Sequence, residues 1–519
     1  MLYFGVENVP CASWDMSQKR NGNGNGISLT APSREFKKKA AVQPPPPEVI
    51  GSEGNSVTFK TSDSVVVRGT PVRVQHHAAV FELYSPYVAL RLSEVLNDFK
   101  ITVQNRSLYS GRVVVLSIID SGSTVVCEVK LEESGWVQEA MTIAQAFTVG
   151  SLAKEFRNFF GSWQKSYKVL PEYKVAIADL QMIFIELRLW LDKIEVEIQL
   201  QPVEVRAEIE KLLINDLQDY ILATVGHLLE RFEQVAEGVT MDARPAHIAY
   251  LQQQIHPFVL SAPFINRTFS KPLGYAGDYE MVSMMVRNPY EGSSLFAKIL
   301  NFIFLKTPPV EAHRNRIVYL KQMLLEETAR ARGNAAGRRV RFLNLGCGPA
   351  KEIQEFLAQH HVCDWAEFLL MDFNEETLDY TAKTLNEIKQ SHERSTEFQF
   401  MKKSVQQLLR EASKLEPLGK FDVVYCAGLF DYISDEVCEK LLEIFYSLTK
   451  PGGLVVATNV ADTNPSRGWM EYALDWHLIY RNVEQFHNLV PAAIRPEAIV
   501  RAIGTGVNIA VEIRKPKNG

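Results

Sequence analysis

The chain has 519 residues, and its 56 Lys and Arg against 61 Asp and Glu give a net charge of −5. Hydrophobic residues make up 46% and charged residues 23%, as in soluble globular proteins, which excludes a wholly disordered or collagen-like chain. The mild acidity provides no electrostatic attraction to nucleic acid or to an anionic membrane. The six scattered cysteines include no C-x-x-C pair, which argues against structural zinc and a disulfide framework.

No targeting or membrane segment is evident. The first residues lack a basic leader followed by an apolar core, which predicts no secretory signal. The most apolar internal stretch, residues 177–198, is interrupted by Asp179, Glu186, Arg188 and Asp192. A bilayer span needs about 20 mostly apolar residues. We therefore expect a cytoplasmic protein with no membrane span.

The first two parts differ in composition. Residues 1–50 contain the run NGNGNG and four consecutive prolines, Pro44 to Pro47, which predict a disordered tail. Residues 51–150 carry short β-rich runs separated by turn residues, which predict a small β-barrel. These runs are SVTFK, VVVRGTPVRVQ, AAVFELY, KITVQNR, GRVVVLSII and TVVCEVKL. One helical piece, Ala89 to Leu96, is expected to interrupt them.

Residues 151–335 change to a helical period. Apolar residues recur every three or four positions across 177–194 and 209–232, which predicts amphipathic helices. We interpret this part as a helical domain that provides a candidate homodimer interface. It contains an unusual polar-aromatic segment, Asn266 to Val282, and a long loop of this kind inside a helical domain is more often functional than decorative.

Residues 336–519 alternate strand and helix. The five expected strands are Val340–Leu345, Glu367–Asp372, Phe398–Lys403, Phe421–Ala427 and Gly453–Val460. The end of the chain reads as two further strands around a Gly504–Gly506 turn. This alternation predicts a doubly wound α/β domain, Rossmann-like, whose mostly parallel sheet ends in a hairpin.

A cofactor site is expected where the first of these strands ends. Gly346 and Gly348 follow it directly, and glycines there let the backbone approach a ligand closely. Asp372 closes the second strand and can accept hydrogen bonds from both hydroxyls of a ribose. A dinucleotide site would need a third glycine where Lys351 stands, and no phosphate-binding G-x-x-x-x-G-K-[ST] run exists. The sequence therefore predicts a nucleoside-containing cofactor other than NAD.

These features resemble the class I S-adenosyl-L-methionine (SAM) methyltransferases. The segments MKKSVQQLL, FDVVYCAGLFDYI and LTKPGGLVVATN are similar to the adenine-contacting turn, the fourth-strand motif and the turn before strand five of that family. The resemblance implies SAM as cofactor. The residues that it implies for cofactor binding are Asn344, Gly346, Cys347, Gly348, Asp372, Phe373, Ser404, Val405 and Ala427. The family usually has an acid where Asn344 stands, so the cofactor's ammonium would lack its charged partner there and affinity would be reduced.

A narrower resemblance concerns the acceptor and the barrel. The segments KPLGYAGDYEM, GLFDYISD and RGWMEYALDWHLIYR are similar to a bacterial group identified with extracellular factor (3-hydroxypalmitic acid methyl ester) biosynthesis. That resemblance implies O-methylation of a fatty-acid carboxyl. The β-rich part resembles a divergent PilZ barrel, but the R-x-x-x-R arm is absent and Asp120-Ser121-Gly122 only loosely echoes the D-x-S-x-x-G loop. These departures argue against cyclic di-GMP binding.

Candidate acceptor-side residues each have two readings. Asp431 is the candidate for acceptor contact or general base, or it caps the following helix. His477, placed in an aromatic-rich helix, is the second catalytic candidate or a structural histidine. Tyr275 and Asp278 form a lid or a tight turn. The aromatic residues Tyr432, Trp476 and Tyr480 are further substrate or lid candidates, although Trp469, Tyr472 and Trp476 share the spacing of a core stripe. No metal is predicted, since the adjacent histidine pairs lack carboxylate neighbours.

The leading hypothesis is a SAM-dependent methyltransferase acting on a small or lipid-like molecule. The alternative is a non-catalytic sensor that binds a nucleoside on the same fold and signals through the barrel. Nucleic-acid modification is a third option that the charge balance does not support.

Overall fold

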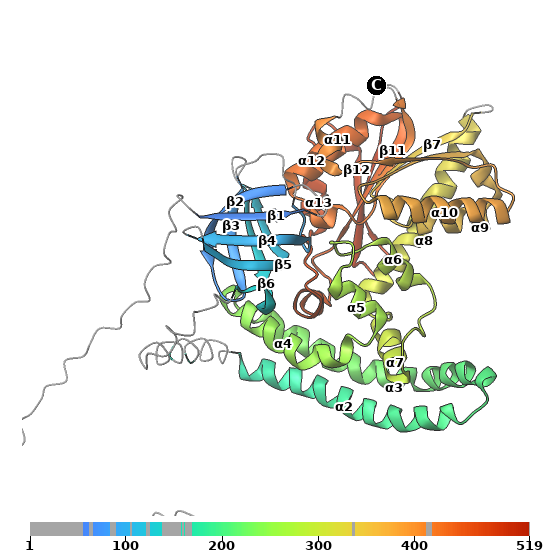
Figure 1. The fold of residues 1–519 in the computed structure, drawn as a ribbon. Helices are drawn as coiled ribbons and strands as arrows, with labels where there is room; N and C mark the ends of the chain where they lie inside the picture. The colour runs from blue at the N-terminus through green and yellow to red at the C-terminus, as the bar shows by residue number, and fades with distance from the viewer. Residues whose placement is uncertain are drawn as a thin grey trace, which may run out of the picture. The chain divides into compact units, whose positions relative to one another are not determined.

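The computed structural model describes residues 55–61, 66–83, 90–103, 106–120, 125–137, 157, 160, 169–334, 338–411 and 418–517. The predicted tail, residues 1–50, lies outside the described residues. Residues 49–519 form one compact unit, in which a barrel, a helical region and an α/β region follow one another along the chain (Figure 1). The predicted residue boundaries between these three parts remain predictions.

The barrel is closed and antiparallel, with the strand order β1-β2-β3-β6-β5-β4. Its strands are β1 (Ser56–Lys60), β2 (Val66–Val74), β3 (Ala78–Leu83), β4 (Val95–Val103), β5 (Arg106–Asp120) and β6 (Val125–Leu131). Every second residue of β6 is buried, as expected when one face of a strand lines a core. The predicted β-barrel is confirmed.

The helical piece expected at Ala89–Leu96 is wrong. Val95 and Leu96 begin strand β4 and pair with β5, and Ser93 has a φ of 60°, which no α-helix contains. Leu90 and Leu92, two positions apart, are both buried in the barrel core. Short apolar runs fit helix and strand patterns equally, and pairing with β5 decided between them.

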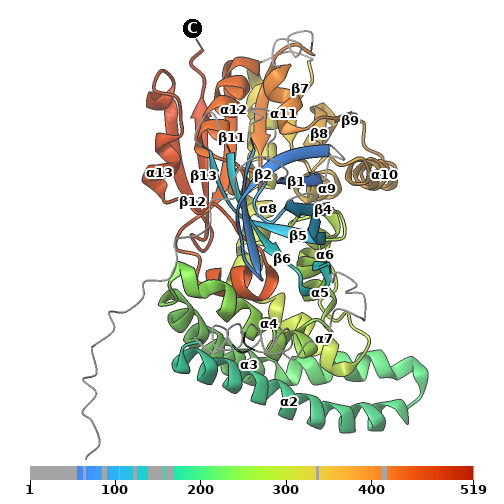
Figure 2. The ribbon, with the colours of Figure 1, turned by 60° about the vertical axis from the view of Figure 1, so that its left-hand side comes forward.

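The helical region confirms the predicted amphipathic helices. It contains α2 (Pro171–Gln199), α3 (Val203–Glu237), α4 (Arg244–Val259), α5 (Pro263–Ser270), α6 (Tyr279–Val286), α7 (Leu295–Phe304) and α8 (Pro308–Asn334). Figure 2 shows α2 and α3 running side by side. The buried face of α2 includes Ile177, Leu180, Phe184 and Leu191, at the helical spacing. No described helix is apolar over a length that would cross a bilayer.

The α/β region is a seven-stranded sheet with the order β12-β13-β11-β10-β7-β8-β9. Its strands are β7 (Val340–Leu345), β8 (Ala366–Asp372), β9 (Glu397–Lys402), β10 (Phe421–Cys426), β11 (Thr449–Val460), β12 (Ala498–Ile503) and β13 (Asn508–Arg514). The five strands β7 to β11 are parallel, and β13 is antiparallel to both β11 and β12. The predicted doubly wound sheet with a terminal hairpin is confirmed.

Helices cover both faces of this sheet (Figure 1). One face packs against α8, α9 (Lys351–Gln359) and α10 (Glu375–Ser391), and the other against α11 (Val405–Arg410), α12 (Asp435–Leu448) and α13 (Val483–Asn488). The chain order reverses between β7 and β10, and ligands of such sheets bind outside the carboxyl ends of the strands at this switch point.

The segment between β11 and α13 packs into the helical region. Trp469 and Tyr472 lie in a single π-helical turn, Trp469–Ala473, and belong to the core formed with α2, α3 and α4. The expected aromatic-rich helix around His477 is wrong, because Asp475 has a φ of 47° and residues 475–482 have no regular structure. For Trp469 and Tyr472, the core-stripe reading describes their positions.

Candidate functional site

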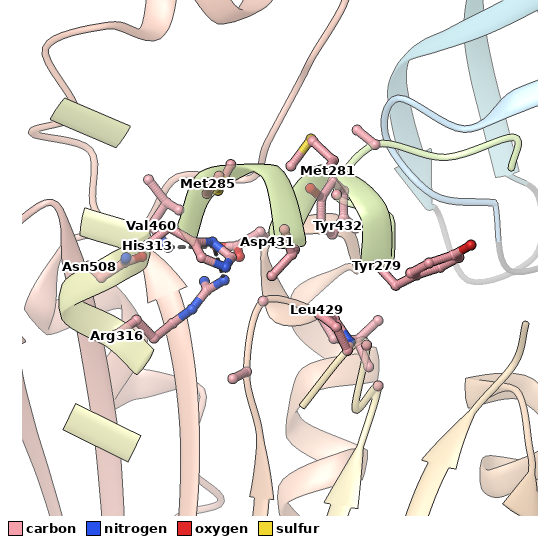
Figure 3. Close-up of a pocket in the computed structure, with 18 of the residues that line it drawn as sticks. Tyr279, Met281, Met285, His313, Arg316, Leu429, Asp431, Tyr432, Val460 and Asn508 are labelled. Atoms are coloured by element: carbon pink, nitrogen blue, oxygen red, sulfur yellow. Dashed lines mark hydrogen bonds between the residues drawn. The ribbon is translucent and has the colours of Figure 1, made fainter. Parts of the chain in front are cut away.

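A cavity of about 170 Å³ lies where β7, β8 and β10 end. Its walls come from the loops after these strands, from α8, from residues 275–277 and from the barrel segment that contains Arg91 and Leu92. Figure 3 shows the α8, α6 and post-β10 side of this pocket. Three parts of the chain that are distant in sequence therefore build a single pocket.

The glycine-rich loop adopts the conformation that its sequence suggested. Gly346 and Gly348 have φ values of 67° and 51°, in the left-handed region that favours glycine. The N–H groups of Gly346 and Cys347 donate to the Met371 carbonyl, at 2.8 and 3.1 Å. These bonds join the end of β7 to the end of β8 and bring the loop beside Asp372.

Asp372 points toward the glycine-rich loop. Its Oδ2 accepts the Gly348 N–H at 3.1 Å, and its Oδ1 accepts the Asn374 N–H at 3.0 Å. The side chain is buried on the pocket wall, and burial raises its pKa. A carboxylate has about four acceptor positions, so both oxygens can still accept a further hydrogen bond.

The opposite side of the loop holds a second buried acid, Glu352, which the sequence analysis missed. Asn344 Nδ2 donates to its Oε1 at 3.2 Å, and the Tyr425 hydroxyl donates to the same oxygen at 2.8 Å. Asn344 Oδ1 is buried and has no hydrogen-bond partner among the described residues. A carboxylate and an unpartnered carbonyl oxygen together suit a ligand ammonium, which donates three hydrogen bonds. Burial raises the pKa of Glu352, and the hydrogen bond from Tyr425 opposes that effect. Glu352 thus places a carboxyl group beside Asn344.

Aromatic side chains cover the far side of Asp372. The Phe373 and Tyr275 ring centroids are 4.8 Å apart at 62°, and the Tyr275 hydroxyl lies 3.3 Å from Thr377 Oγ1. The guanidinium carbon of Arg91 lies 3.9 Å from the Phe373 ring centroid. Tyr275 lines the pocket, its lid role remains a prediction, and Arg91 brings the barrel into the same site.

Asp431 is buried on the pocket wall in the loop after β10. Its Oδ1 accepts the Val460 N–H at 2.6 Å, which ties this loop to the end of β11. Burial raises its pKa, and the charge of Arg316 opposes that effect. The helix-cap reading is wrong, because α12 begins after Ser434. A buried carboxyl group with a raised pKa is suited to taking a proton.

Tyr432 and Trp476 also line the pocket and contact each other. Trp476 Nε1 donates to the Tyr432 hydroxyl at 2.9 Å. Ala427 and Cys347 are on the pocket wall as well. The roles predicted for these residues remain predictions.

Five predicted site residues do not line the pocket: Asp278, Ser404, Val405, His477 and Tyr480. Asp278 caps α6 through the Met281 N–H and pairs with Arg267 at 2.9 Å. Ser404 caps α11, one residue beyond the backbone bond from Lys403 to Asp372. The adenine contact predicted for Ser404 and Val405 remains a prediction.

His477 and Tyr480 are partly exposed and lie outside the pocket wall. The His477 N–H donates to the Ser93 hydroxyl of the barrel, and Arg467 lies over the Tyr480 ring at 4.7 Å. Burial lowers the pKa of His477. These contacts join the segment after β11 to its neighbours, and they bring neither side chain to the cavity.

Two pocket residues from α8, His313 and Arg316, were also missed. Arg316 Nη2 donates to His313 Nδ1 at 2.8 Å, beside Asp431 (Figure 3). The only signal in the sequence was that Arg316 is a basic residue beside the apolar positions Ile317, Leu320 and Leu324. These positions lie on α8, the helix that precedes the first strand of the sheet.

Comparison with known proteins identifies the domain around this pocket. Residues 343–455 match the family model described as a methyltransferase domain. The chain therefore contains a methyltransferase domain, which confirms the predicted enzyme class. No curated protein matches the chain.

Solved structures with detectable likeness are distant. A possible exported protein from Bordetella parapertussis is 17% identical, with a TM-score of 0.37 over 52% of this chain and 95% of its own. An O-methyltransferase family protein from Burkholderia thailandensis is 13% identical, with a TM-score of 0.29 over 54% and 75%. The N-methyltransferase NodS from Bradyrhizobium japonicum, in complex with S-adenosyl-L-homocysteine, is 12% identical, with a TM-score of 0.28 over 46% and 98%.

Proposed function

We propose that the methyltransferase domain of this chain transfers a methyl group from SAM to a small or lipid-like acceptor in the pocket described above. One observation carries the proposal. The Gly348 N–H bonds to Asp372 on one side of the loop, and Glu352 lies beside the unpartnered Asn344 oxygen on the other. These are the donors and acceptors that the two ends of an adenosine-linked amino acid require.

The residues of the chain would hold SAM at three points. Asp372 accepts hydrogen bonds from the ribose hydroxyls, and Phe373 and Tyr275 provide apolar surface beside it. Glu352 and Asn344 accept hydrogen bonds from the ammonium. Gly346 and Gly348 let the backbone pass close to the ligand.

Bound SAM supplies an electrophilic methyl carbon: an acceptor lone pair forms the new bond as the carbon–sulfur bond breaks, and that electron pair returns to sulfur. The protein chiefly aligns the acceptor with this carbon. A carboxylate acceptor is already anionic and needs no base. For a hydroxyl acceptor, Asp431 is the pocket-lining carboxylate that can accept the proton.

The fatty-acid carboxyl implied by the narrower resemblance is the finer proposal for the acceptor. The pocket has an apolar wall that supports an acceptor with hydrocarbon character. This wall includes Met281, Met285, Ile317, Leu320, Met470 and Leu478. Apolar lining with a few polar groups is typical of sites for such ligands.

Calorimetry on the full chain tests cofactor binding. We expect wild-type protein to bind SAM and Asp372→Ala to bind it roughly 10- to 100-fold more weakly, because hydrogen bonds to a charged group are lost. Asp379→Ala, at an exposed position of α10, is the matched control. Wild-type protein that binds no SAM would overturn the proposal.

A second measurement separates the enzyme from the sensor alternative, which the contribution of barrel residue Arg91 to the pocket supports. Cell extracts incubated with methyl-labelled SAM are analysed by mass spectrometry. An enzyme yields a labelled product with wild-type protein and less of it with Asp372→Ala. A sensor binds SAM and labels nothing.

A further inference from the structure

We propose that Arg316 binds a carboxylate of a ligand held in the pocket. This inference rests on the proposed function, and it adds a binding residue from α8, outside the sheet and its crossover helices. The carboxylate has two possible sources: the methionyl end of SAM or an acidic acceptor. Both present the same chemistry to the guanidinium, and the experiment below distinguishes them.

Arg316 is buried at the pocket. The residue is 8% exposed and lies on the pocket wall. A buried guanidinium loses its hydration and needs hydrogen-bond acceptors or a paired charge in return. Among the described residues, Arg316 donates a hydrogen bond to His313 Nδ1, and no carboxylate forms an ion pair with it within 4.0 Å.

The two nearby carboxylates each accept hydrogen bonds from other parts of the chain, and neither forms an ion pair with Arg316 among the described residues. Asp431 and Glu352 are the acids whose charges act on Arg316. Asp431 Oδ1 accepts the Val460 N–H, and Glu352 Oε1 accepts from Asn344 and Tyr425. The guanidinium has five N–H donors, so most of its hydrogen-bonding capacity is left for the pocket.

His313 and Gly428 hold the guanidinium at the cavity. Burial lowers the pKa of His313 well below its ordinary value, so the ring is neutral and Nδ1 accepts the Arg316 bond. On the other side, a Cβ on Gly428 would lie 3.0 Å from Arg316 Nη2. The glycine after β10 therefore leaves space for Arg316 at the strand end where ligands of this fold bind.

Arg316 lies near Glu352, and the two side chains together suit the two charged ends of one ligand group. Arg316 and Glu352 line the same pocket and lie close enough for their charges to interact. An arginine and an acid with an unpartnered amide oxygen together match the carboxylate and ammonium of an α-amino acid. A planar guanidinium also matches a carboxylate in bidentate geometry, which a lysine does not.

The experiment compares ligand pairs that differ in one carboxylate. Calorimetry measures binding of SAM and of decarboxylated SAM, and then of decanoate and decanol in the presence of S-adenosylhomocysteine. Wild type, Arg316→Gln and Arg316→Lys are compared. Arg332→Gln, at an exposed position of the same helix, is the matched control. Thermal unfolding of each ligand-free variant checks folding.

If the methionyl carboxylate is bound, Arg316→Gln weakens SAM binding roughly 10- to 100-fold and changes decarboxylated SAM less than about threefold. If an acceptor carboxylate is bound, SAM affinity is unchanged and the preference for decanoate over decanol is lost. Arg316→Lys recovers part of either effect, since it keeps the charge without the fork.

Two results count against different statements. If the Arg316 variants bind both ligand pairs with the same affinities as the wild type, the assignment of Arg316 is overturned. Wild-type protein that binds neither nucleoside overturns the proposed function, and the decanoate pair still tests Arg316. Ligand-free Arg316→Gln should unfold no earlier than wild type, because a buried cation without an ion pair contributes little stability. A lower midpoint with unchanged binding would assign Arg316 a purely structural role.

Discussion

Glu352 illustrates how a single residue compensates for a departure at another. The strand end that carries an acid in similar domains carries Asn344, and the carboxylate comes from the first turn of α9. Asn344 donates to that carboxylate and leaves its own oxygen without a partner. The reduced affinity expected from Asn344 alone therefore does not follow once Glu352 is counted.

The first prediction concerns the charge of Glu352. Glu352→Gln should weaken SAM binding about 10-fold or more, because an ammonium loses a charge-assisted hydrogen bond. It should change binding of methylthioadenosine, which lacks the amino-acid end, by less than about twofold. Titration calorimetry of both ligands measures this difference.

Glu355→Gln is the control for that variant, because Glu355 lies on the same helix and pairs with Lys321 near the surface. Equal losses for both ligands would show that Glu352 supports the loop and does not contact the ammonium.

At the scale of elements, α3 holds the segment after β11 through one acid. Glu233 accepts the Gly468 N–H at 2.6 Å and the Trp469 N–H at 2.7 Å. Burial raises the pKa of Glu233 to about 7, although these two hydrogen bonds oppose the effect. The carboxyl group therefore changes charge near neutral pH at the point where the π-helical turn begins.

The second prediction is a pH dependence of stability. The folded pKa of Glu233 lies above its unfolded value of 4.5, so the folded state binds more protons between these values. Its contribution to stability is thus fully present below about pH 4.5 and is lost as pH rises through about 7, a change of about 3 kcal/mol. Thermal unfolding of wild type and Glu233→Gln from pH 5 to pH 8 should show a wild-type advantage that decreases with pH.

Glu230→Gln, at an exposed position of α3, should leave the pH profile of the wild type unchanged. A constant difference between wild type and Glu233→Gln across this range would contradict the assignment of the titration to Glu233.

The barrel segment before β4 is the second element-scale feature. The Val95 N–H donates to the Gly274 carbonyl at 2.6 Å, and Ser93 contacts His477. These bonds place Arg91 over Phe373 at the pocket. The barrel is therefore part of the pocket wall as well as a neighbouring fold.

The third prediction follows from the cation–π contact. Such contacts contribute about 0.5–2 kcal/mol, so Arg91→Ala should weaken SAM binding by roughly 2- to 30-fold. Arg73→Ala, at an exposed position of β2, should have no effect on binding. Equal SAM affinity in Arg91→Ala and wild type, measured by calorimetry, would place Arg91 outside the ligand's reach.

At the scale of the whole molecule, one buried cluster joins the three parts. Lys130 of the barrel pairs with Asp475 at 2.8 Å and donates to Gln252 of α4 at 2.6 Å. Gln252 in turn donates to Asp475 at 3.0 Å. Asp475 is 2% exposed, so its carboxylate depends on these partners.

The fourth prediction is that Lys130→Ala destabilises the folded chain by about 3–5 kcal/mol, because it leaves a buried carboxylate without its nearest cation. Lys60→Ala removes an exposed pair with Asp98 and should leave the unfolding midpoint nearly unchanged. Thermal unfolding of both variants makes the comparison. Similar midpoints would show that Asp475 finds another partner, such as nearby Lys271.

Homodimer formation through the helical region remains a prediction of the sequence, as does a cytoplasmic location. Light scattering of the purified chain measures the molar mass and tests the first. Fractionation of cells that produce the protein tests the second.

Local pattern was sufficient for most of the fold. The strands β7, β8 and β10 are nearly continuous apolar runs, which buried parallel strands require, whereas the edge strand β9 alternates, and the glycines after β7 mark the tight turn. The hydrophobic pattern gave a wrong prediction of secondary structure where the apolar segment was short. Leu90, Leu92 and Leu96 fit a helix or a strand, and pairing of Val95 and Leu96 with β5 chose the strand.

The sequence alone therefore predicted the barrel, the helices, the doubly wound sheet and the loop that faces Asp372, because each depends on residues close together along the chain. It did not reveal that Arg91, Arg316 and Glu352 meet at one pocket, since these residues come from the barrel, α8 and α9. Their encounter depends on how separately folded elements pack, and side-chain periodicity within one element carries no record of its distant neighbours.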